Sequence, residues 1–174
     1  MGRLRLRGRP FVVIDCGSMW RIENPELRSA KLDFTSSEQG VREVTQLFVD
    51  EVQLINAIEL VEWNEEEAQF LICEDCGFSH CKSGDWVRVR RTDSLVLILP
   101  SFNYVAPERP EETTEYRPPR YLKERGIAYV DRAAWEELSA QNASFPSFDQ
   151  IAQLNPREAT LLSHWAPPAQ GLPG

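Results

Sequence analysis

The stretch of residues 70–89, FLICEDCGFSHCKSGDWVRV, contains three of the four cysteines of the chain and one of its two histidines. Cys73 and Cys76 form a CxxC pair followed by Gly77, which is the pattern of a zinc knuckle. The tight turn of this pattern directs both thiolates toward one point, and a glycine after it avoids backbone strain. Cys81 is a candidate third ligand in the same loop. One structural zinc ion is therefore a predicted cofactor.

A structural zinc site takes four ligands, so these three cysteines need a fourth partner. The chain has no second CxxC pair. Cys16 is the preferred candidate because it lies in another predicted turn, Cys16-Gly17-Ser18. His80 is the alternative ligand, although its place next to Cys81 is awkward for binding the same ion. His164, near the C-terminus, is a further candidate for the fourth position.

Two further interpretations of the cysteines stay open. Reduced cysteines without metal pack as small hydrophobic side chains. A redox or disulfide role is the third interpretation, and two features disfavour it. The CxxC pair opens no predicted helix, and the neighbouring Glu74 and Asp75 should raise the pKa of the thiols by like-charge repulsion. Four cysteines in a chain of 174 residues also do not suggest a disulfide-built scaffold.

Apolar segments on both sides of this loop predict the strands that hold it. Gln69–Cys73 should lead into the loop and Gly84–Arg91 should leave it, followed by a turn and the continuous apolar run Leu95–Leu99. These three strands predict an antiparallel meander whose last strand is buried on both faces. In the second strand Arg88 and Arg90 alternate with apolar residues, which predicts one face exposed to water. Arg88, Arg90 and Arg91 should pair there with local carboxylates, and the alternative is that they bind an anion.

The remaining elements are predicted from the alternation of apolar and polar residues, from helix-capping residues, and from Gly and Pro residues that end helices and strands. Expected strands are Pro10–Asp15 and Trp20–Glu23, paired as a hairpin, then Ala30–Phe34 and Ile127–Val130. Expected helices are Asp50–Glu59 capped by Asp50, a short turn at Tyr121–Arg125, Arg132–Gln141 capped by Asp131, Phe148–Leu154 capped by Ser147, and a start at Asn155-Pro156-Arg157-Glu158. Residues 41–63 show mixed helical and strand spacing.

Together these elements predict an α+β fold in a single domain over residues 1–174. An antiparallel sheet of about five or more strands should occupy the N-terminal two thirds, with helices mainly in the C-terminal third. Within the domain we expect a flexible basic arm (1–9), a mainly β core with the cysteine loop (10–99), a Pro/Glu-rich connection (100–120) and a mainly helical part (121–168).

The charge of the chain indicates the kind of partner. The net charge is −8, and the segment from Glu43 to Asp75 has ten acidic residues and no basic one. Nucleic-acid binding needs clustered Lys and Arg, so the body of the protein is not suited to it. An acidic surface instead favours a basic protein partner. The candidate interaction surface consists of Glu62, Glu65, Glu66 and Glu67.

No apolar run approaches the length of about 20 residues that spans a membrane, and the apolar part of the N-terminal segment is shorter than that of a secretory signal. A cytoplasmic protein without membrane contact is therefore expected. Motifs of the GxGxxG, GxxxxGK[ST], HExxH and GxSxG type are absent from the sequence. The favoured function is a non-enzymatic soluble interaction protein, of the immunity or adaptor kind. The alternative is a zinc- or thiol-dependent enzyme or redox protein that uses Cys73, Cys76 and Cys81.

Overall fold

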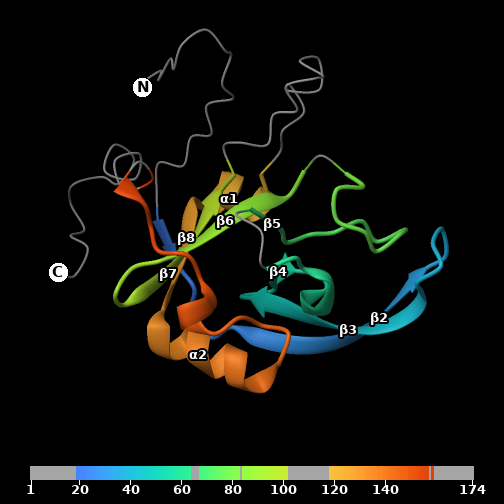
Figure 1. Ribbon diagram of the computed structural model, residues 1–174, viewed down its shortest axis with the longest axis horizontal. Coiled ribbons are helices and arrows are strands. Elements are labelled where there is room, and N and C mark those ends of the chain that lie inside the picture. Colours follow the sequence, from blue (N-terminus) through green and yellow to red (C-terminus); the bar gives the residue numbers. More distant parts are fainter. Residues whose placement is uncertain (1–18, 64–66, 83, 102–117, 157, 159–174) are drawn as a thin grey trace, which may run out of the picture.

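The computed structural model describes residues 19–63, 67–82, 84–101, 118–156 and 158, and these form two β-sheets with little helix (Figure 1). The larger sheet has five strands in the order β1-β8-β7-β6-β5. They are β1 (Met19–Arg21), β5 (Ala68–Gln69), β6 (Trp86–Arg91), β7 (Leu95–Pro100) and β8 (Ile127–Asp131). All neighbouring pairs are antiparallel except β1 and β8, which run parallel.

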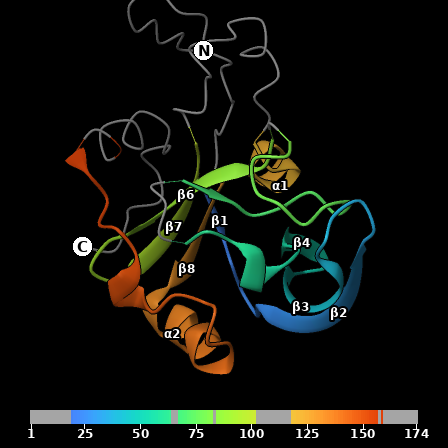
Figure 2. The same ribbon diagram turned by 45° about the vertical axis from the view of Figure 1, so that its right-hand side comes forward.

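The smaller sheet is an antiparallel unit in the order β2-β3-β4. Its strands are β2 (Glu26–Phe34), β3 (Gly40–Val49) and β4 (Val52–Ile55). Asp50 and Glu51 connect β3 to β4 with φ angles of 48° and 62°. Two consecutive positive φ values are those of a type I′ hairpin turn, whose twist matches that of the strands. Figures 1 and 2 show the long β2–β3 hairpin reaching away from the larger sheet, with the β5–β6 loop beside its tip.

The main core lies between one face of the large sheet, the small sheet and the helix α2 (Arg132–Gln141). Val89, Ile98 and Val130 of the large sheet share this core with Leu54 of the small sheet and Trp135 of α2. The opposite face of the large sheet carries a second apolar cluster, in which Leu95, Leu97, Leu99 and Ile127 are buried. Every residue of β7 is buried, which confirms the prediction of a strand covered on both faces.

The predicted single antiparallel sheet with helices mainly in the C-terminal third is wrong. There are two sheets, one pair of strands is parallel, and the described residues include only one helix longer than two turns, the ten-residue α2. A second α-helix is the six-residue α1 (Arg120–Arg125), Pro156 and Glu158 are also helical, and single 3-10 turns occur at Ile58–Leu60 and Phe148–Gln150. The C-terminal third instead supplies β8, and Gln153 forms a parallel bridge with Arg91.

The helix predicted over Asp50–Glu59 is also wrong, because Asp50 begins the hairpin turn and β4 follows it. The β5–β6–β7 meander is confirmed, although β5 is shorter than the predicted Gln69–Cys73. The helix Arg132–Gln141 has the predicted bounds, although the Asp131 carboxylate pairs with Arg21 instead of capping it. No described helix is long and apolar enough to cross a membrane.

Several predictions lie wholly or partly outside the described residues. These are the arm 1–9, the strand Pro10–Asp15 of the first hairpin, most of the connection 100–120, and residues 159–168 of the predicted helical part. The other strand of that hairpin, Trp20–Glu23, overlaps β1, whose neighbour in the described sheet is β8.

Candidate metal centre

The loop between β5 and β6 brings three cysteine sulfurs together. The Sγ atoms of Cys73, Cys76 and Cys81 all lie within 4.8 Å of one another. Tetrahedral zinc binds thiolates at about 2.3 Å, which places two ligand sulfurs roughly 3.8 Å apart. Cys73 and Cys76 are half-buried and Cys81 is exposed. The three sulfurs are therefore close enough to bind a metal ion together.

Gly77 is the residue that permits the turn after the CxxC pair. Its N–H donates to the carbonyl oxygen of Cys73 at 2.9 Å, and its φ is +71°, in the left-handed region. A Cβ at this position would stand 3.0 Å from the nearest ring atom of Phe34. Glycine is thus required both by the backbone conformation and by the close approach of the β2 strand.

The turn between β2 and β3 holds the cysteine loop from one side. The backbone N–H and the hydroxyl of Ser36 both donate to the carbonyl oxygen of Asp75, at 3.3 Å and 2.6 Å. The side-chain amide of Gln39 donates to the carbonyl oxygen of Gly77 at 3.2 Å. These hydrogen bonds attach the CxxC turn to the tip of the hairpin that lies beside it in Figure 1.

Two buried amide side chains hold the ends of the loop. The Gln69 amide donates to the carbonyl oxygens of Lys82 and Gly84, and its oxygen accepts from the N–H of His80. Asn56 forms a pair of hydrogen bonds with the backbone of Ile72, both at 3.0 Å. Because buried polar groups are costly unless they are hydrogen-bonded, these contacts fix the path of the chain into and out of the cysteine cluster.

The environment of the sulfurs shifts the pKa values of two thiols in opposite directions. The backbone N–H of Cys76 bonds to the sulfur of Cys73 and, with the N–H of Asp75, lowers the pKa of Cys73 against the effect of burial. Hydrogen bonds to the sulfurs of Cys76 and Cys73 raise the pKa of Cys81 to about 12. The prediction that acidic neighbours raise the thiol pKa values is therefore wrong for Cys73, because adjacent backbone N–H groups dominate there.

The structure does not place His80 among the converging ligand atoms. Its ring packs against Trp86 with 4.6 Å between the centroids, and its Nε2 lies 3.6 Å from the Glu62 carboxylate. The other candidates, Cys16 and His164, lie outside the described residues. The fourth ligand stays a prediction.

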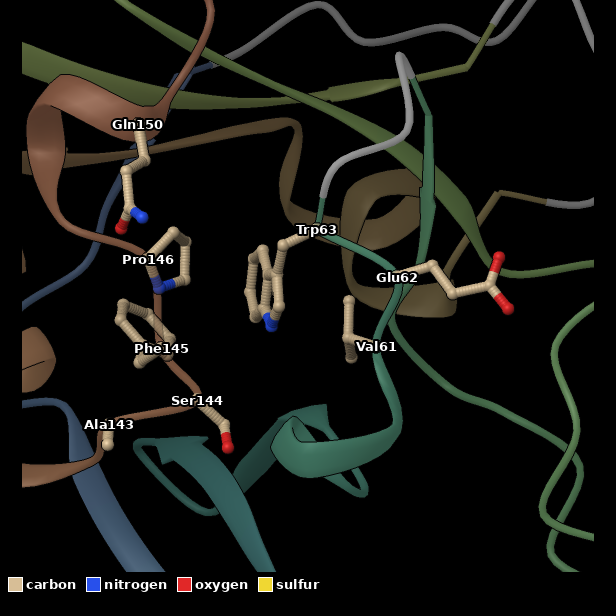
Figure 3. Close-up of a pocket in the computed structure, with 8 residues that line it drawn as sticks. All are labelled: Val61, Glu62, Trp63, Ala143, Ser144, Phe145, Pro146 and Gln150. Carbon is tan, nitrogen blue, oxygen red and sulfur yellow. The ribbon is translucent and has the colours of Figure 1, made fainter.

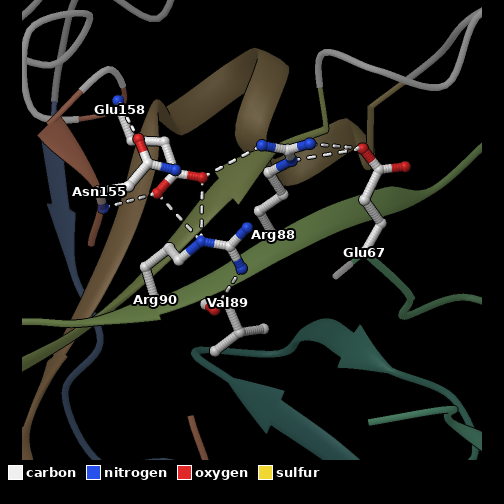
Figure 4. Close-up of polar contacts among 6 residues, drawn as sticks. All are labelled: Glu67, Arg88, Val89, Arg90, Asn155 and Glu158. Atoms are coloured by element: carbon white, nitrogen blue, oxygen red, sulfur yellow. Dashed lines mark hydrogen bonds and ion pairs between the residues drawn. The ribbon is translucent and has the colours of Figure 1, made fainter. Parts of the chain in front are cut away.

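Arg88 and Arg90 do not lie on a face exposed to water, as the alternation had suggested. They are 6% and 3% exposed, and both contact the buried Glu158 carboxylate, at 3.2 Å from Arg88 Nη1 and 2.9 Å from Arg90 Nε (Figure 4). Arg88 also pairs with Glu67 at 3.1 Å. The predicted pairing of these arginines with carboxylates is confirmed. Asn155 and Glu158 form the predicted capping box, with reciprocal hydrogen bonds of 3.1 Å and 2.9 Å.

The candidate acidic surface is divided by this arrangement. Glu62 is exposed, whereas Glu67 is half-buried in its pair with Arg88. Glu65 and Glu66 lie outside the described residues.

No feature of the sequence indicates the pocket between residues 61–63 and 143–150 (Figure 3). Its two walls are far apart in the chain and share no motif. The supporting roles of Gln69 and Asn56 were also missed. The only signal for Asn56 was a polar residue inside the apolar run LINAI.

Comparison with protein-family models, curated proteins and solved structures finds no match to this chain.

Proposed function

We propose that this protein is a non-enzymatic binding protein whose cysteine loop is held by one structural zinc ion. The observation that supports this most strongly is the convergence of the Cys73, Cys76 and Cys81 sulfurs within 4.8 Å. The backbone hydrogen bond from Cys76 to the sulfur of Cys73 adds to it, because such bonds stabilise the thiolate that binds metal. Zinc would supply no reaction chemistry in this role; it would link the CxxC turn to Cys81.

A structural role suits the poor packing of the loop. From residue 73 to residue 82 only Gly77 is buried, and the Phe78 side chain is 51% exposed. A segment with so few buried apolar side chains gains little from the hydrophobic effect. Metal binding supplies folding free energy directly in such segments, because the ligands are brought together only in the folded state.

The binding role is proposed from the distribution of acidic residues. Some carboxylates of the acidic segment have partners within the protein, as Glu51 does with Arg28. Glu62, Glu74 and Asp75 are exposed on and beside the cysteine loop. We expect this face to bind a basic protein partner, with electrostatic attraction increasing the rate of encounter. An immunity-like or adaptor protein would function in this way.

The zinc proposal is tested on the full chain purified without chelator. We expect about one zinc per chain by elemental analysis, and a lower unfolding temperature after the metal is removed. Cys81→Ser should lose zinc, whereas Ser79→Ala, a change in the same loop outside the cluster, should retain it. Metal-free protein whose unfolding is unchanged by added zinc would contradict the proposal. A single thiol that is alkylated unusually fast would then favour the alternative, a thiol-dependent enzyme.

The partner proposal is tested by the salt dependence of binding. Proteins from a cell extract that bind the immobilised chain are eluted with a salt gradient, and the complex with the purified partner is measured at low and high ionic strength. We expect a basic partner and weaker binding at high salt, because salt screens attraction between exposed charges. An acidic partner, or an affinity independent of ionic strength, would contradict this part of the proposal.

A further inference from the structure

A pocket of about 380 Å³ lies between two segments that are distant in the chain. Val61, Glu62 and Trp63, which follow the first 3-10 turn, form one wall. The other wall is formed by residues 143–146, which follow α2, and by Gln150. Figure 3 shows the Trp63 ring between Val61 and the pair Phe145 and Pro146. The volume is within the range of small-ligand sites, roughly 300–1,000 Å³.

Hydrogen bonds within each wall and next to the pocket fix its shape. The indole Nε1 of Trp63 donates to the carbonyl oxygen of Ile58 at 3.3 Å. The indole Nε1 of Trp135 donates to the carbonyl oxygen of Pro146 at 2.8 Å. Next to the pocket, the side-chain amide of Asn142 donates to the Glu59 carboxylate at 3.0 Å, which links the segments that precede the two walls. A pocket held in this way is already formed before a ligand binds, so binding requires little ordering of the protein.

The lining attracts a planar cation. The Trp63 and Phe145 rings pack edge to face, with 5.2 Å between their centroids and 62° between their planes, and Phe145 is 2% exposed. The half-buried Trp63 therefore provides the aromatic surface of the cavity. Aromatic faces attract cations, and tryptophan does so most strongly. Among the described residues, the lining includes one carboxylate, that of Glu62, and no Lys or Arg. Figure 3 shows the Glu62 side chain turned outward from the cavity, so its charge acts at the edge and leaves the interior free.

A second carboxylate stands beside the pocket. Glu59 bonds to Asn142, whose neighbour Ala143 is part of the lining. Burial disfavours the charged form of Glu59, but hydrogen bonds from Thr45 and Asn142 outweigh it and lower the pKa, so this group is anionic at neutral pH. Two negative charges therefore flank an aromatic cavity whose lining has no positive side chain.

We infer that this pocket binds an arginine side chain of a basic protein partner, with the guanidinium plane stacked on Trp63. The inference rests on the proposed basic-partner function and specifies where the partner is recognised. Arginine fits better than lysine because its guanidinium is planar, stacks on aromatic rings and is weakly hydrated. The hydroxyl of Ser144 and the amide oxygen of Gln150 are hydrogen-bond acceptors in the same lining.

The test is a titration of the full chain with a penta-arginine peptide, followed by NMR at the indole N–H of Trp63. Trp63→Phe assigns that signal. Penta-citrulline is the probe control, because citrulline has nearly the shape of arginine without its charge. Ser144→Tyr fills the pocket from an exposed position, and Ala133→Tyr adds the same ring at an exposed position of α2 outside it. Glu62→Gln removes the edge charge, and Glu23→Gln is its exposed control. The amide spectrum of each variant reports whether it is folded.

We expect penta-arginine to shift the Trp63 signal and penta-citrulline to leave it unchanged. Ser144→Tyr should weaken binding at least tenfold, and Glu62→Gln about two- to fivefold, the range of an exposed charge pair. Ala133→Tyr and Glu23→Gln should bind as the unaltered chain does. Equal binding of penta-arginine by Ser144→Tyr would overturn the pocket while leaving a basic partner in place. Equal binding of penta-citrulline would overturn the choice of a cation. If the natural partner binds with salt sensitivity but penta-arginine leaves the Trp63 signal unmoved, the pocket is overturned and the proposed function stands.

Discussion

Replacing Glu158 by glutamine should destabilise the protein through the two buried arginines of β6. The Glu158 carboxylate is buried and contacts the buried side chains of Arg88 and Arg90. Glutamine has nearly the same shape and can still accept the capping hydrogen bond from the N–H of Asn155. The Glu158→Gln change therefore removes the charge and retains the cap.

The size of the effect follows from the burial of the pair. Removing one partner of a buried ion pair costs about 3–5 kcal/mol, because the other charge stays out of water. Arg88 keeps Glu67 at 3.1 Å, and Arg90 keeps a hydrogen bond to the carbonyl oxygen of Val89. We therefore expect the lower end of this range, about 3 kcal/mol. For a chain of this size that corresponds to a decrease of roughly 6–12 °C in the unfolding temperature.

The assay is urea unfolding at pH 7, followed by circular dichroism. Glu158→Ala should cost about 1 kcal/mol more than Glu158→Gln, because it also removes the cap. The double variant Arg90→Met with Glu158→Leu should recover much of the loss, since apolar residues of similar volume can replace a buried pair. A Glu158→Gln protein within about 0.5 kcal/mol of the unaltered chain would refute the view that the buried contacts of Glu158 with Arg88 and Arg90 stabilise the fold.

Two further changes test the loop and its surroundings. Gly77→Ala should lower the free energy of unfolding by more than the roughly 1–2 kcal/mol that an alanine in the left-handed region costs, because its Cβ would meet the Phe34 ring. Gly40→Ala is the matched control, because Gly40 has a φ of +62° and a Cβ there would have nothing within 4 Å. Equal losses of unfolding free energy in urea for the two variants would contradict the role of the Phe34 contact. Glu59→Gln should lower the free energy of unfolding by about 1 kcal/mol at pH 7. The pKa of Glu59 in the folded protein is below its ordinary value of 4.5. The stabilisation by its carboxylate is therefore present above pH 4.5 and is lost as the pH falls through the pKa of the folded protein. The difference from the unaltered chain should therefore shrink toward pH 3, and a difference independent of pH would contradict this origin.

Local patterns in the sequence predicted much of the structure around the cysteines. The alternation in Gly84–Arg91 and the apolar run that follows it correspond to β6 and β7. The CxxC pair and Gly77 predicted the turn, and Asp131 marked the start of α2. Each of these features depends on neighbouring residues, whose spacing and backbone preferences are visible in the sequence.

The failed predictions depend on contacts between distant parts of the chain. Arg88 is buried because it pairs with Glu158, which lies 70 residues later in the chain. Alternation within β6 contains no information on this partner and therefore suggests a face exposed to water. The parallel pairing of β1 with β8 joins residues that are about 110 apart, as Arg21 and Asp131 are. The β3–β4 turn uses Asp50 and Glu51 at positive φ, where Asn-Gly or Asp-Gly is the usual signal. Helical spacing was therefore given too much weight in residues 50–59.

X-ray absorption at the zinc edge of the full chain tests the central claim most directly. We predict that the protein loaded with one equivalent of zinc shows at least three sulfur neighbours at about 2.3 Å, the distance of zinc–thiolate bonds. Cys81→Ser should remove one sulfur from this shell, and Cys16→Ser should remove one only if Cys16 is the fourth ligand. A protein that retains no zinc, or a shell of oxygen and nitrogen alone at about 2.0–2.1 Å, would contradict the metal centre.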